Sequence, residues 1–379
     1  MSADPGGADD QVLSKPGAGA AVVFGTRPEI IKLAGIVELL GARATTIYSG
    51  QHFDHLLSEV FFGELNLSQP DVRLAVGGRS RAQQIGQVVL GLEGQFDAHR
   101  PSAVIVQGDT NSALGGALAA NAVGVPLVHV EAGLRSFDRA MPEEHNRVVI
   151  DHLADLCLAP TEQARDHLLA ERIPPERVAV TGNTVVDAAS RLLPGPAERA
   201  GLVSDLGLER GAYVLATFHR PENVDDAGQL ASLLEHLARL GLPVLFPAHP
   251  RTRKRVDAFE LGGPAAGVRM VAPIGYRAFL GLAAECAFLV SDSGGVQEEA
   301  SVVKRPALVV RRSTERPEVQ GTFATLVPSL ADLPDAAAGL LAGLAGTHRW
   351  LAGLPTPYGD GRASARCVHH IARMLEDRA

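Results

Sequence analysis

Short apolar runs, each followed by a polar cluster and then a helix-like segment, recur along most of the chain. In the first half these runs lie at 20–24, 44–48, 103–106, 127–130, 156–159 and 178–180. Apolar runs of this length, without alternation of apolar and polar positions, are typical of strands buried inside a parallel sheet. Because strands and helices alternate, we expect a parallel sheet covered by helices on both faces.

The same pattern begins again in the second half of the chain. Apolar runs lie there at 213–217, 244–247, 288–290 and 307–310. Residues 192–207, between the two halves, are rich in proline and glycine, which favours a link between domains. A chain of 379 residues is also too long for one hydrophobic core. The pattern therefore predicts an α/β protein with two Rossmann-like, doubly wound domains that face a cleft.

The domain boundaries follow from this pattern. We assign residues 19–190 to an N-terminal domain and residues 191–357 to a C-terminal domain. Residues 1–18 are polar and acidic, without the apolar stretch of a signal peptide, and are expected to form a flexible tail. A helix-like pattern at 363–377 is expected to return to the first domain, so we assign residues 358–379 to that domain.

Composition excludes several classes of function. The net charge is −8 and no sizeable basic cluster exists, which argues against a nucleic-acid surface. No run of about 20 apolar residues is present, so no membrane span is predicted. The three cysteines are widely spaced, as expected of reduced thiols in a cytoplasmic protein. No histidine or cysteine spacing predicts a metal site.

Two acids stand just beyond neighbouring predicted strands. Asp109 follows the run 103–106, and Glu131 follows the run 127–130. Ligands of open α/β sheets bind outside the carboxyl ends of the strands, so both carboxylates are expected to face one substrate. Each acid alone is also explained by capping of the following helix.

A third group of charged residues follows these two acids closely in the sequence. Glu143, Glu144 and Arg147 lie in a predicted helix at 142–154. Together with the two acids at the strand ends, they favour a catalytic interpretation of this half of the chain over simple helix capping.

Phosphate-binding features occur in both halves. The segment 25–32 reads as a strand end, a glycine turn and a helix start, and Arg27 and Lys32 add positive charge to it. In the second half, Ser293-Gly-Gly opens a helix, where bare N–H groups and the helix dipole favour a diphosphate. Glu298 or Glu299 would accept hydrogen bonds from a ribose. A plain glycine-rich turn remains the structural alternative.

Two further residues have both a functional and a structural interpretation. His219 follows a predicted strand, where it would donate to a phosphate or serve as a buried structural side chain. Arg316 is either a phosphate ligand or an ion-paired loop residue. The Gly-x-Gly-x-x-Gly pattern of nicotinamide sites is absent, as is a Walker A sequence, so no cofactor is predicted.

Eight motifs together resemble the non-hydrolysing UDP-N-acetylglucosamine 2-epimerases. The resemblance runs in order from about residue 20 to residue 370. The motifs are Gly25-Thr-Arg-Pro-Glu, Gly108-Asp-Thr, His129-Val-Glu-Ala-Gly-Leu-Arg135, Pro142-Glu-Glu-His-Asn-Arg147, Gly182-Asn-Thr, Asp292-Ser-Gly-Gly-Val-Gln-Glu-Glu-Ala300, Thr314-Glu-Arg-Pro-Glu318 and Pro357-Tyr-Gly-Asp-Gly361.

The resemblance implies a fold and a reaction. The fold would be glycosyltransferase-B-like and usually dimeric, with UDP held by the C-terminal domain and the C-terminal helix crossing back. The reaction would invert C2 of UDP-GlcNAc to give UDP-ManNAc without an external cofactor. The route would be anti elimination of UDP to 2-acetamidoglucal, followed by re-addition of UDP on the other C2 face.

The resemblance also implies roles for individual residues. Asp109 and Glu131 would be the acid/base pair, supported by Glu143 and Arg147. Which of the two carboxylates takes the proton stays open. The residues implied to bind the UDP-sugar are Arg27, His219 and Ser293, Gly294 and Gly295 at the diphosphate, Glu299 at the ribose, Phe279 near the uracil, and Lys32 and Arg316 at the phosphate and sugar.

The family has a second, allosteric UDP-GlcNAc site. Gln51, His52, Arg79 and His249 occupy the matching motifs here. Several positions differ from the family pattern: His219-Arg-Pro-Glu-Asn-Val-Asp225 lacks an arginine and a glycine, and the residues after Arg79 also differ. These differences concern regulation more than the acid/base residues.

Three alternative activities remain at this stage. A hydrolysing 2-epimerase would release free ManNAc and UDP, and differs only in whether water reaches the glycal. A glycosyltransferase-B-type sugar transferase would need an acceptor site. A catalytically silent sugar-nucleotide sensor would not need the acids at 109, 131 and 143.

Overall fold

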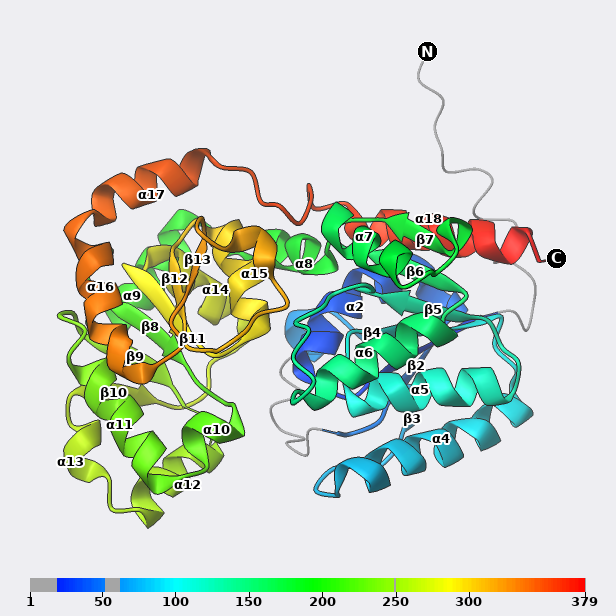
Figure 1. Cartoon of the computed structure of the whole chain (residues 1–379), viewed down its shortest axis with the longest axis horizontal. Helices are drawn as coiled ribbons and strands as arrows, with labels where there is room; N and C mark the ends of the chain where they lie inside the picture. The colour runs from blue at the N-terminus through cyan, green and yellow to red at the C-terminus, as the bar shows by residue number, and fades with distance from the viewer. Residues whose placement is uncertain (1–18, 52–61, 249, 379) are drawn as a thin grey trace. The chain divides into compact units, whose positions relative to one another are not determined.

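The computed structural model describes residues 19–51, 62–248 and 250–378. The expected flexible tail, residues 1–18, lies outside the described residues. The described chain forms two compact units (Figure 1). The first comprises the chain up to Ala188 together with the segment that begins at Tyr358, and the second comprises Ala189–Pro357.

The first unit is built on a seven-stranded sheet in the order β3-β2-β1-β4-β5-β6-β7, in which all pairings are parallel. Its central strands are wholly buried, which explains their unbroken apolar sequences. The strands are β1 (Ala20–Phe24), β2 (Ala44–Tyr48), β3 (Val72–Arg73), β4 (Ala103–Gln107), β5 (Leu127–Val130), β6 (Leu156–Ala159) and β7 (Val178–Val180).

Helices cover this sheet and complete the first unit. Helix α5 packs between α4 and α6, whereas α18 packs on α2 (Figure 1). Helix α5 is rich in alanine and glycine and is buried nearly all round, so it shows no amphipathic pattern. The helices are α2 (Arg27–Leu40), α4 (Arg81–Ala98), α5 (Asn111–Ala122), α6 (Pro142–Leu153), α7 (Glu162–Ala170) and α18 (Ala363–Glu376), with short 3-10 turns η1 (Gly41–Arg43) and η2 (Pro175–Arg177).

The second unit has a six-stranded parallel sheet in the order β10-β9-β8-β11-β12-β13. Its hydrophobic core joins these strands to leucines of the amphipathic helix α11. The strands are β8 (Val214–Thr217), β9 (Val244–Pro247), β10 (Val268–Val271), β11 (Phe288–Ser291), β12 (Ala307–Val309) and β13 (Ala324–Leu326). The helices are α9 (Pro196–Asp205), α10 (Pro221–Val224), α11 (Ala227–Ala238), α12 (Pro250–Ala258), α13 (Gly262–Ala265), α14 (Tyr276–Glu285), α15 (Gly294–Val303), α16 (Leu333–Ala342) and α17 (Leu344–Gly353), with η3 (Pro317–Val319) and η4 (Leu330–Asp332).

The expected link at 192–207 is not a linker. The chain passes from the first unit to the second within helix α8 (Thr184–Leu192), and most of 192–207 forms α9. The cause is local: Gly195 caps the helix and Pro196 occupies its first turn, where a missing N–H is harmless. Helix α9 packs against α14 within the second unit.

Both sheets reverse their strand order at one point. In the first unit this switch lies between β1 and β4, and in the second it lies between β8 and β11. The loops that follow a switch point diverge to opposite faces of the sheet, which leaves room for a ligand outside the carboxyl ends of the strands. In both units the predicted site residues follow strands at or beside this point.

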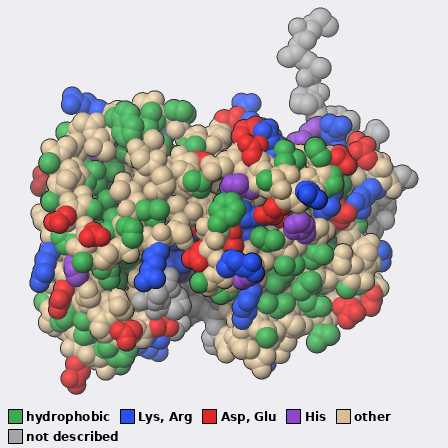
Figure 2. All heavy atoms as spheres, viewed as in Figure 1, with side chains coloured by type: hydrophobic (Ala, Val, Ile, Leu, Met, Phe, Trp, Pro, Cys, Tyr) green, Lys and Arg blue, Asp and Glu red, His purple; other side chains and the backbone are tan. Residues whose placement is uncertain are grey.

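The surface view agrees with the charge pattern of the sequence. On the face shown in Figure 2, Lys and Arg side chains are interspersed with Asp and Glu rather than gathered into one basic area. Within the described residues, no helix is both long and apolar enough to cross a membrane. The three cysteines are buried free thiols.

Candidate functional site

The loops after β4 and β5 bring the two predicted acids to the same edge of the first sheet. These strands are neighbours, with Gln107 in register with Val130, and the Gly108 N–H donates to the Val130 carbonyl at 3.1 Å. Asp109 and Glu131 therefore leave the sheet from adjacent strand ends. This juxtaposition follows from parallel pairing and matches the expectation from the sequence.

Glu131 is buried and held by two side chains. Lys32 Nζ lies 2.5 Å from its Oε2, and the Gln107 amide donates to the same oxygen at 3.2 Å. Only 7% of Glu131 is exposed. Its φ of +66° lies in the left-handed region, which is uncommon for a residue with a side chain. Such backbone strain is found preferentially at functional sites.

Asp109 is more accessible and is paired with Arg147. The side chain of Asp109 is 28% exposed, and one of its oxygens accepts a hydrogen bond from Arg147 of α6. The Asn146 amide donates to the backbone carbonyl of Asp109 at 2.7 Å. Helix α6 thus fixes the loop after β4 through two successive residues.

Glu143 and Glu144 have different environments. Glu143 is exposed at the start of α6, whereas Glu144 is buried and accepts a hydrogen bond from Arg147. Burial opposes the ionisation of Glu144, but hydrogen bonds from Ser136 and the charge of Arg147 lower its pKa below the ordinary value. Within α6, Arg147 is therefore paired with Glu144, whereas Glu143 is exposed on the same turn.

A further carboxylate, Glu29, links the two loops at the switch point. Its Oε2 accepts hydrogen bonds from the N–H groups of Gly25 and Thr26, at 3.0 and 2.7 Å, and its Oε1 accepts one from Thr110 at 2.7 Å. Burial raises the pKa of Glu29 to about 7, against the lowering effect of these bonds. Arg27, half-buried, occupies the first position of α2 beside them.

His219 in the second unit is exposed and oriented by a buried acid. Its Nδ1 lies 3.0 Å from Asp292, whose side chain is fully buried, while 61% of the His219 side chain is exposed. Asp292 also accepts hydrogen bonds from the Arg220 backbone and the Asn223 amide. Burial opposes ionisation of Asp292, but His219 and these donors lower its pKa. Most of the His219 side chain therefore stays exposed while Nδ1 is held by Asp292.

The segment Ser293, Gly294 and Gly295 opens α15, as the sequence predicts. Ser293 is the N-cap residue and its side chain makes no capping hydrogen bond, so the hydroxyl is not committed to the helix. A Cβ at Gly294 would lie 2.6 Å from Glu315, whereas one at Gly295 would meet nothing closer than Ser293 Oγ at 3.8 Å.

Arg316 lies beneath this helix start in a buried group of charges. It pairs with Glu298 at 2.7 Å and with Glu315 at 2.9 Å, and Glu315 also pairs with Arg311 at 2.7 Å. Of the two acids considered for the ribose, Glu298 is fully buried and bonded to Arg316, and Glu299 is 8% exposed.

The uracil and ribose candidates belong to two adjoining helices. Phe279 of α14 is 9% exposed. Burial, together with the negative charge of Glu299, raises the pKa of Tyr276 at the start of α14 well above its ordinary value. Glu299 therefore lies close to the α14 helix that carries Phe279.

The residues expected at an allosteric site are only partly described. Gln51 accepts hydrogen bonds from the backbone and hydroxyl of Ser112 at 2.9 and 2.8 Å, next to the start of α5. Arg79 is exposed. His52 and His249 lie outside the described residues.

Several residues of these two sites were not predicted from the sequence. Gln107, Glu29 and Asp292 hold the predicted residues in place, and Glu144 rather than Glu143 contacts the arginine. Asp292 carried a signal, since it stands between a strand and the glycine turn. The two adjacent acids of α6 differ only in which side of the helix they occupy, which the sequence alone does not show.

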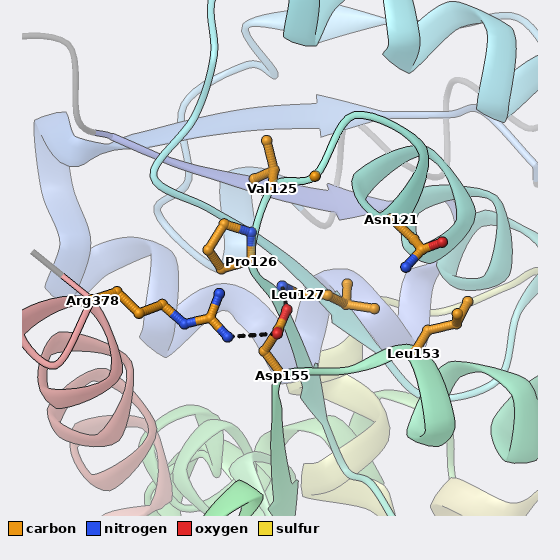
Figure 3. Close-up of a pocket in the computed structure, with 8 residues that line it drawn as sticks. Asn121, Val125, Pro126, Leu127, Leu153, Asp155 and Arg378 are labelled. Carbon is orange, nitrogen blue, oxygen red and sulfur yellow. Dashed lines mark hydrogen bonds and ion pairs between the residues drawn. The ribbon is translucent and has the colours of Figure 1, made fainter.

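A pocket of about 250 Å³ lies elsewhere in the first unit (Figure 3). Its lining includes Leu127, the first residue of β5, and Asp155, which precedes β6 and pairs with Arg378. It therefore lies at the amino ends of these strands, opposite to the edge that carries Asp109 and Glu131.

Comparison with known proteins gives a consistent result. Residues 40–372 match the family model described as UDP-N-acetylglucosamine 2-epimerase. A protein of that name from Methanococcus maripaludis is 38% identical over 307 residues, which is 78% of this chain and 84% of the relative. The UDP-2,3-diacetamido-2,3-dideoxy-D-glucuronate 2-epimerase of Pseudomonas aeruginosa is 34% identical over 93% of this chain and 99% of the relative.

A solved structure extends the likeness to the fold. The UDP-GlcNAc 2-epimerase of Methanocaldococcus jannaschii, in complex with UDP-GlcNAc and UDP, superposes with a TM-score of 0.84 at 36% identity over 93% of this chain and 99% of that chain. The predicted fold class, two doubly wound α/β domains of the glycosyltransferase-B-like kind, is confirmed. Family model, relatives and fold agree, and the chain belongs to the UDP-N-acetylglucosamine 2-epimerase family.

Proposed function

We propose that this protein interconverts UDP-GlcNAc and UDP-ManNAc without net hydrolysis and without an external cofactor. The observation that carries the proposal is the pair Asp109 and Glu131 at adjacent strand ends, each beside its own cation. Inversion of C2 needs one group that removes the C2 proton and a second group that returns a proton to the opposite face. Two independently held carboxylates meet that need.

The proposed route has two balanced steps. A carboxylate removes the C2 proton while the C1–O bond breaks, which gives 2-acetamidoglucal and UDP. UDP oxygen then attacks C1 as the second acid protonates C2 from the other face. Lys32 holds Glu131 in place, and Arg147 holds Asp109. Glu143, exposed on the same helix as Arg147, supports the two acids. Which carboxylate acts first in each direction stays open.

The second unit supplies the diphosphate contacts in this proposal. The start of α15 with Ser293, Gly294 and Gly295 offers backbone N–H groups and the positive end of a helix dipole. His219, oriented by Asp292, donates to the departing diphosphate. The M. jannaschii relative described above was solved with UDP-GlcNAc and UDP bound, which supports this ligand class.

The remaining expectations are part of the same proposal. Arg27, together with Lys32 and Arg316, completes the phosphate and sugar contacts. Glu299 accepts a hydrogen bond from the ribose, and Phe279 lies near the uracil.

We also propose a homodimer and a second UDP-GlcNAc site around Gln51 and Arg79. Sedimentation of the purified protein tests the first, and a monomer at all concentrations would overturn it. Sigmoidal dependence of the rate on UDP-GlcNAc tests the second.

A second substrate deserves a direct comparison. The P. aeruginosa relative is matched over nearly its whole length and is named for UDP-2,3-diacetamido-2,3-dideoxy-D-glucuronate. Both substrates present the same C2 acetamido group and the same UDP. Competition between the two substrates in one assay distinguishes them: the one with the higher kcat/KM is the preferred sugar.

The deciding experiment is proton NMR of the purified protein with UDP-GlcNAc in D2O. We expect deuterium at C2 and a growing UDP-ManNAc signal. Free ManNAc with UDP would identify the hydrolysing reaction. An unchanged spectrum, repeated with sugar acceptors, would overturn the epimerase proposal and favour a transferase or a sugar-nucleotide sensor.

A further inference from the structure

A buried group of charges lies directly behind the two candidate acid/base loops. Its centre is Asp151 of α6, whose side chain is wholly buried. The carboxylate accepts from His129 at 2.6 Å, from Arg135 at 2.7 Å and from the Gly133 N–H at 3.2 Å. All three partners belong to the single segment 129–135, which contains Glu131.

The first connection runs from Asp151 to the loop of Asp109. His129 on β5 is fully buried, with Nδ1 on the Asp151 carboxylate and Nε2 2.8 Å from the Gly108 carbonyl. The imidazole therefore bridges the Asp151 carboxylate and the Gly108 carbonyl. It fixes the peptide that immediately precedes Asp109.

The second connection runs from Asp151 to the loop of Glu131. Glu131 has a φ of +66°, and Gly133, two residues later, has a φ of +82°. The Gly133 N–H and the Arg135 side chain both donate to Asp151, which holds this strained turn from behind. Arg135 is itself clamped by two bonds to Glu171, at 2.7 and 2.6 Å.

We propose that Asp151 is a positioning residue that fixes the loops of Asp109 and Glu131 relative to each other. The inference rests on the proposed epimerase function, for which it names a further required residue. Burying an ion network costs desolvation free energy, and apolar side chains of similar volume often stabilise the fold equally well. Its value here is geometric, because one carboxylate is connected to both loops.

The test is an Asp151→Asn variant of the full chain. We expect kcat for UDP-ManNAc formation to fall by about 100-fold, as loss of alignment at a reacting centre does. KM for UDP-GlcNAc and the Kd for UDP, measured by calorimetry, should stay within about twofold, because most of the proposed UDP contacts belong to the second unit and Asp151 is bonded to none of the proposed UDP ligands. Hydrogen exchange of the Gly133 amide should accelerate.

Matched variants separate positioning from simple loss of stability. Glu171→Gln weakens the outer ion pair but leaves every contact of Asp151 in place, so it should lower Tm and keep kcat. His129→Gln retains an amide able to donate to Gly108 and should lose less activity than His129→Leu.

The outcomes are distinct. If wild-type protein epimerises UDP-GlcNAc while Asp151→Asn and His129→Leu keep wild-type kcat, the positioning role is wrong and the proposed function stands. If kcat falls equally in Glu171→Gln and Asp151→Asn, in step with Tm, the network is merely structural. If wild-type protein leaves C2 unlabelled in D2O, the proposed function fails and the inference fails with it.

Discussion

The two units share one topology and differ in chemistry. Each has a parallel sheet whose order reverses at a switch point, and in each the candidate residues follow strands at or beside that point. In the first unit the candidates are carboxylates held by the buried cations Lys32 and Arg147. In the second they are an exposed imidazole, His219, and an open helix start at Ser293.

The difference shows which property of a site depends on topology and which depends on the local sequence. The doubly wound sheet determines where a ligand meets the protein, whichever residues are there. The few residues after each strand determine the chemistry, so one fold can carry carboxylates in one unit and an open helix start in the other. Breaking one unit should therefore leave the other unit's task intact, and the following predictions test that separation.

The largest effect is expected from the carboxylates. Glu131→Gln or Asp109→Asn should lower kcat by about 10²- to 10⁴-fold, because each removes a proton donor or acceptor while keeping its shape. The Kd for UDP should stay nearly unchanged. Rates of C2 deuteration by NMR and calorimetry with UDP measure the two quantities. Wild-type activity in both variants would show that neither carboxylate moves the proton.

His219 tests the second unit in the same way. His219→Asn should lower kcat by about 10²-fold, through lost stabilisation of the departing diphosphate. Steady-state rates measure this loss. His236→Asn is the control, since that ring is on α11 and bonds to the Ser232 carbonyl. Equal activity of the His219→Asn variant and the control would remove His219 from the mechanism.

Two glycines at the start of α15, Gly294 and Gly295, test whether this helix start binds the diphosphate. Gly295→Ala places a Cβ at an ordinary contact distance of 3.8 Å from Ser293 Oγ, so the fold should tolerate it while UDP binds about tenfold more weakly through the loss of close approach. Gly294→Ala instead disturbs Glu315 and should lower Tm as well. Calorimetry and thermal unfolding separate the two. Unchanged UDP affinity in Gly295→Ala would mean that the diphosphate lies elsewhere.

The smallest effect concerns stability and its pH dependence. The pKa of Glu29 is raised to about 7 in the fold, from an ordinary value of 4.5. A raised pKa means that the stabilising contribution of the protonated form is present below 4.5 and is lost as pH rises through 7. Glu29→Gln mimics the protonated form, so its Tm relative to wild type should rise by several degrees from pH 5 to pH 8.

The control for this prediction is Glu38→Gln, at an exposed position of the same helix. Its Tm difference from wild type should be nearly independent of pH. A Tm difference for Glu29→Gln that stays constant from pH 5 to pH 8 would contradict a raised pKa for Glu29.

The sequence predicted the sheet centres better than the sheet edges. The strands at 20–24, 44–48, 127–130, 156–159 and 244–247, all inside their sheets, have the predicted bounds, and so does one short edge strand, at 178–180. Three strands, β3, β10 and β13, were not predicted, and all three are edge strands. Edge strands are short and partly exposed, as Arg269 in β10 illustrates, so they lack the unbroken apolar run that marks a buried strand.

The candidate site, too, could be predicted from the sequence only in part. Asp109 and Glu131 were predictable, because parallel pairing brings successive strand ends together. The partner of Glu131 was not, since Lys32 is 99 residues away in the sequence and was expected at the phosphate or sugar. Contacts between distant segments depend on how helices pack on the sheet, and local pattern carries no information about that packing.

The return of the chain to the first unit has a consequence for synthesis. Helix α18, the last helix in the sequence, packs on α2, and its first residue is held by Asp187 through the Ala363 N–H at 3.0 Å. Helix α2 in turn carries Glu29 and Lys32. On the ribosome, the whole second unit is therefore made before the first unit can be completed. The unit that carries Asp109 and Glu131 is therefore begun before the second unit and completed after it.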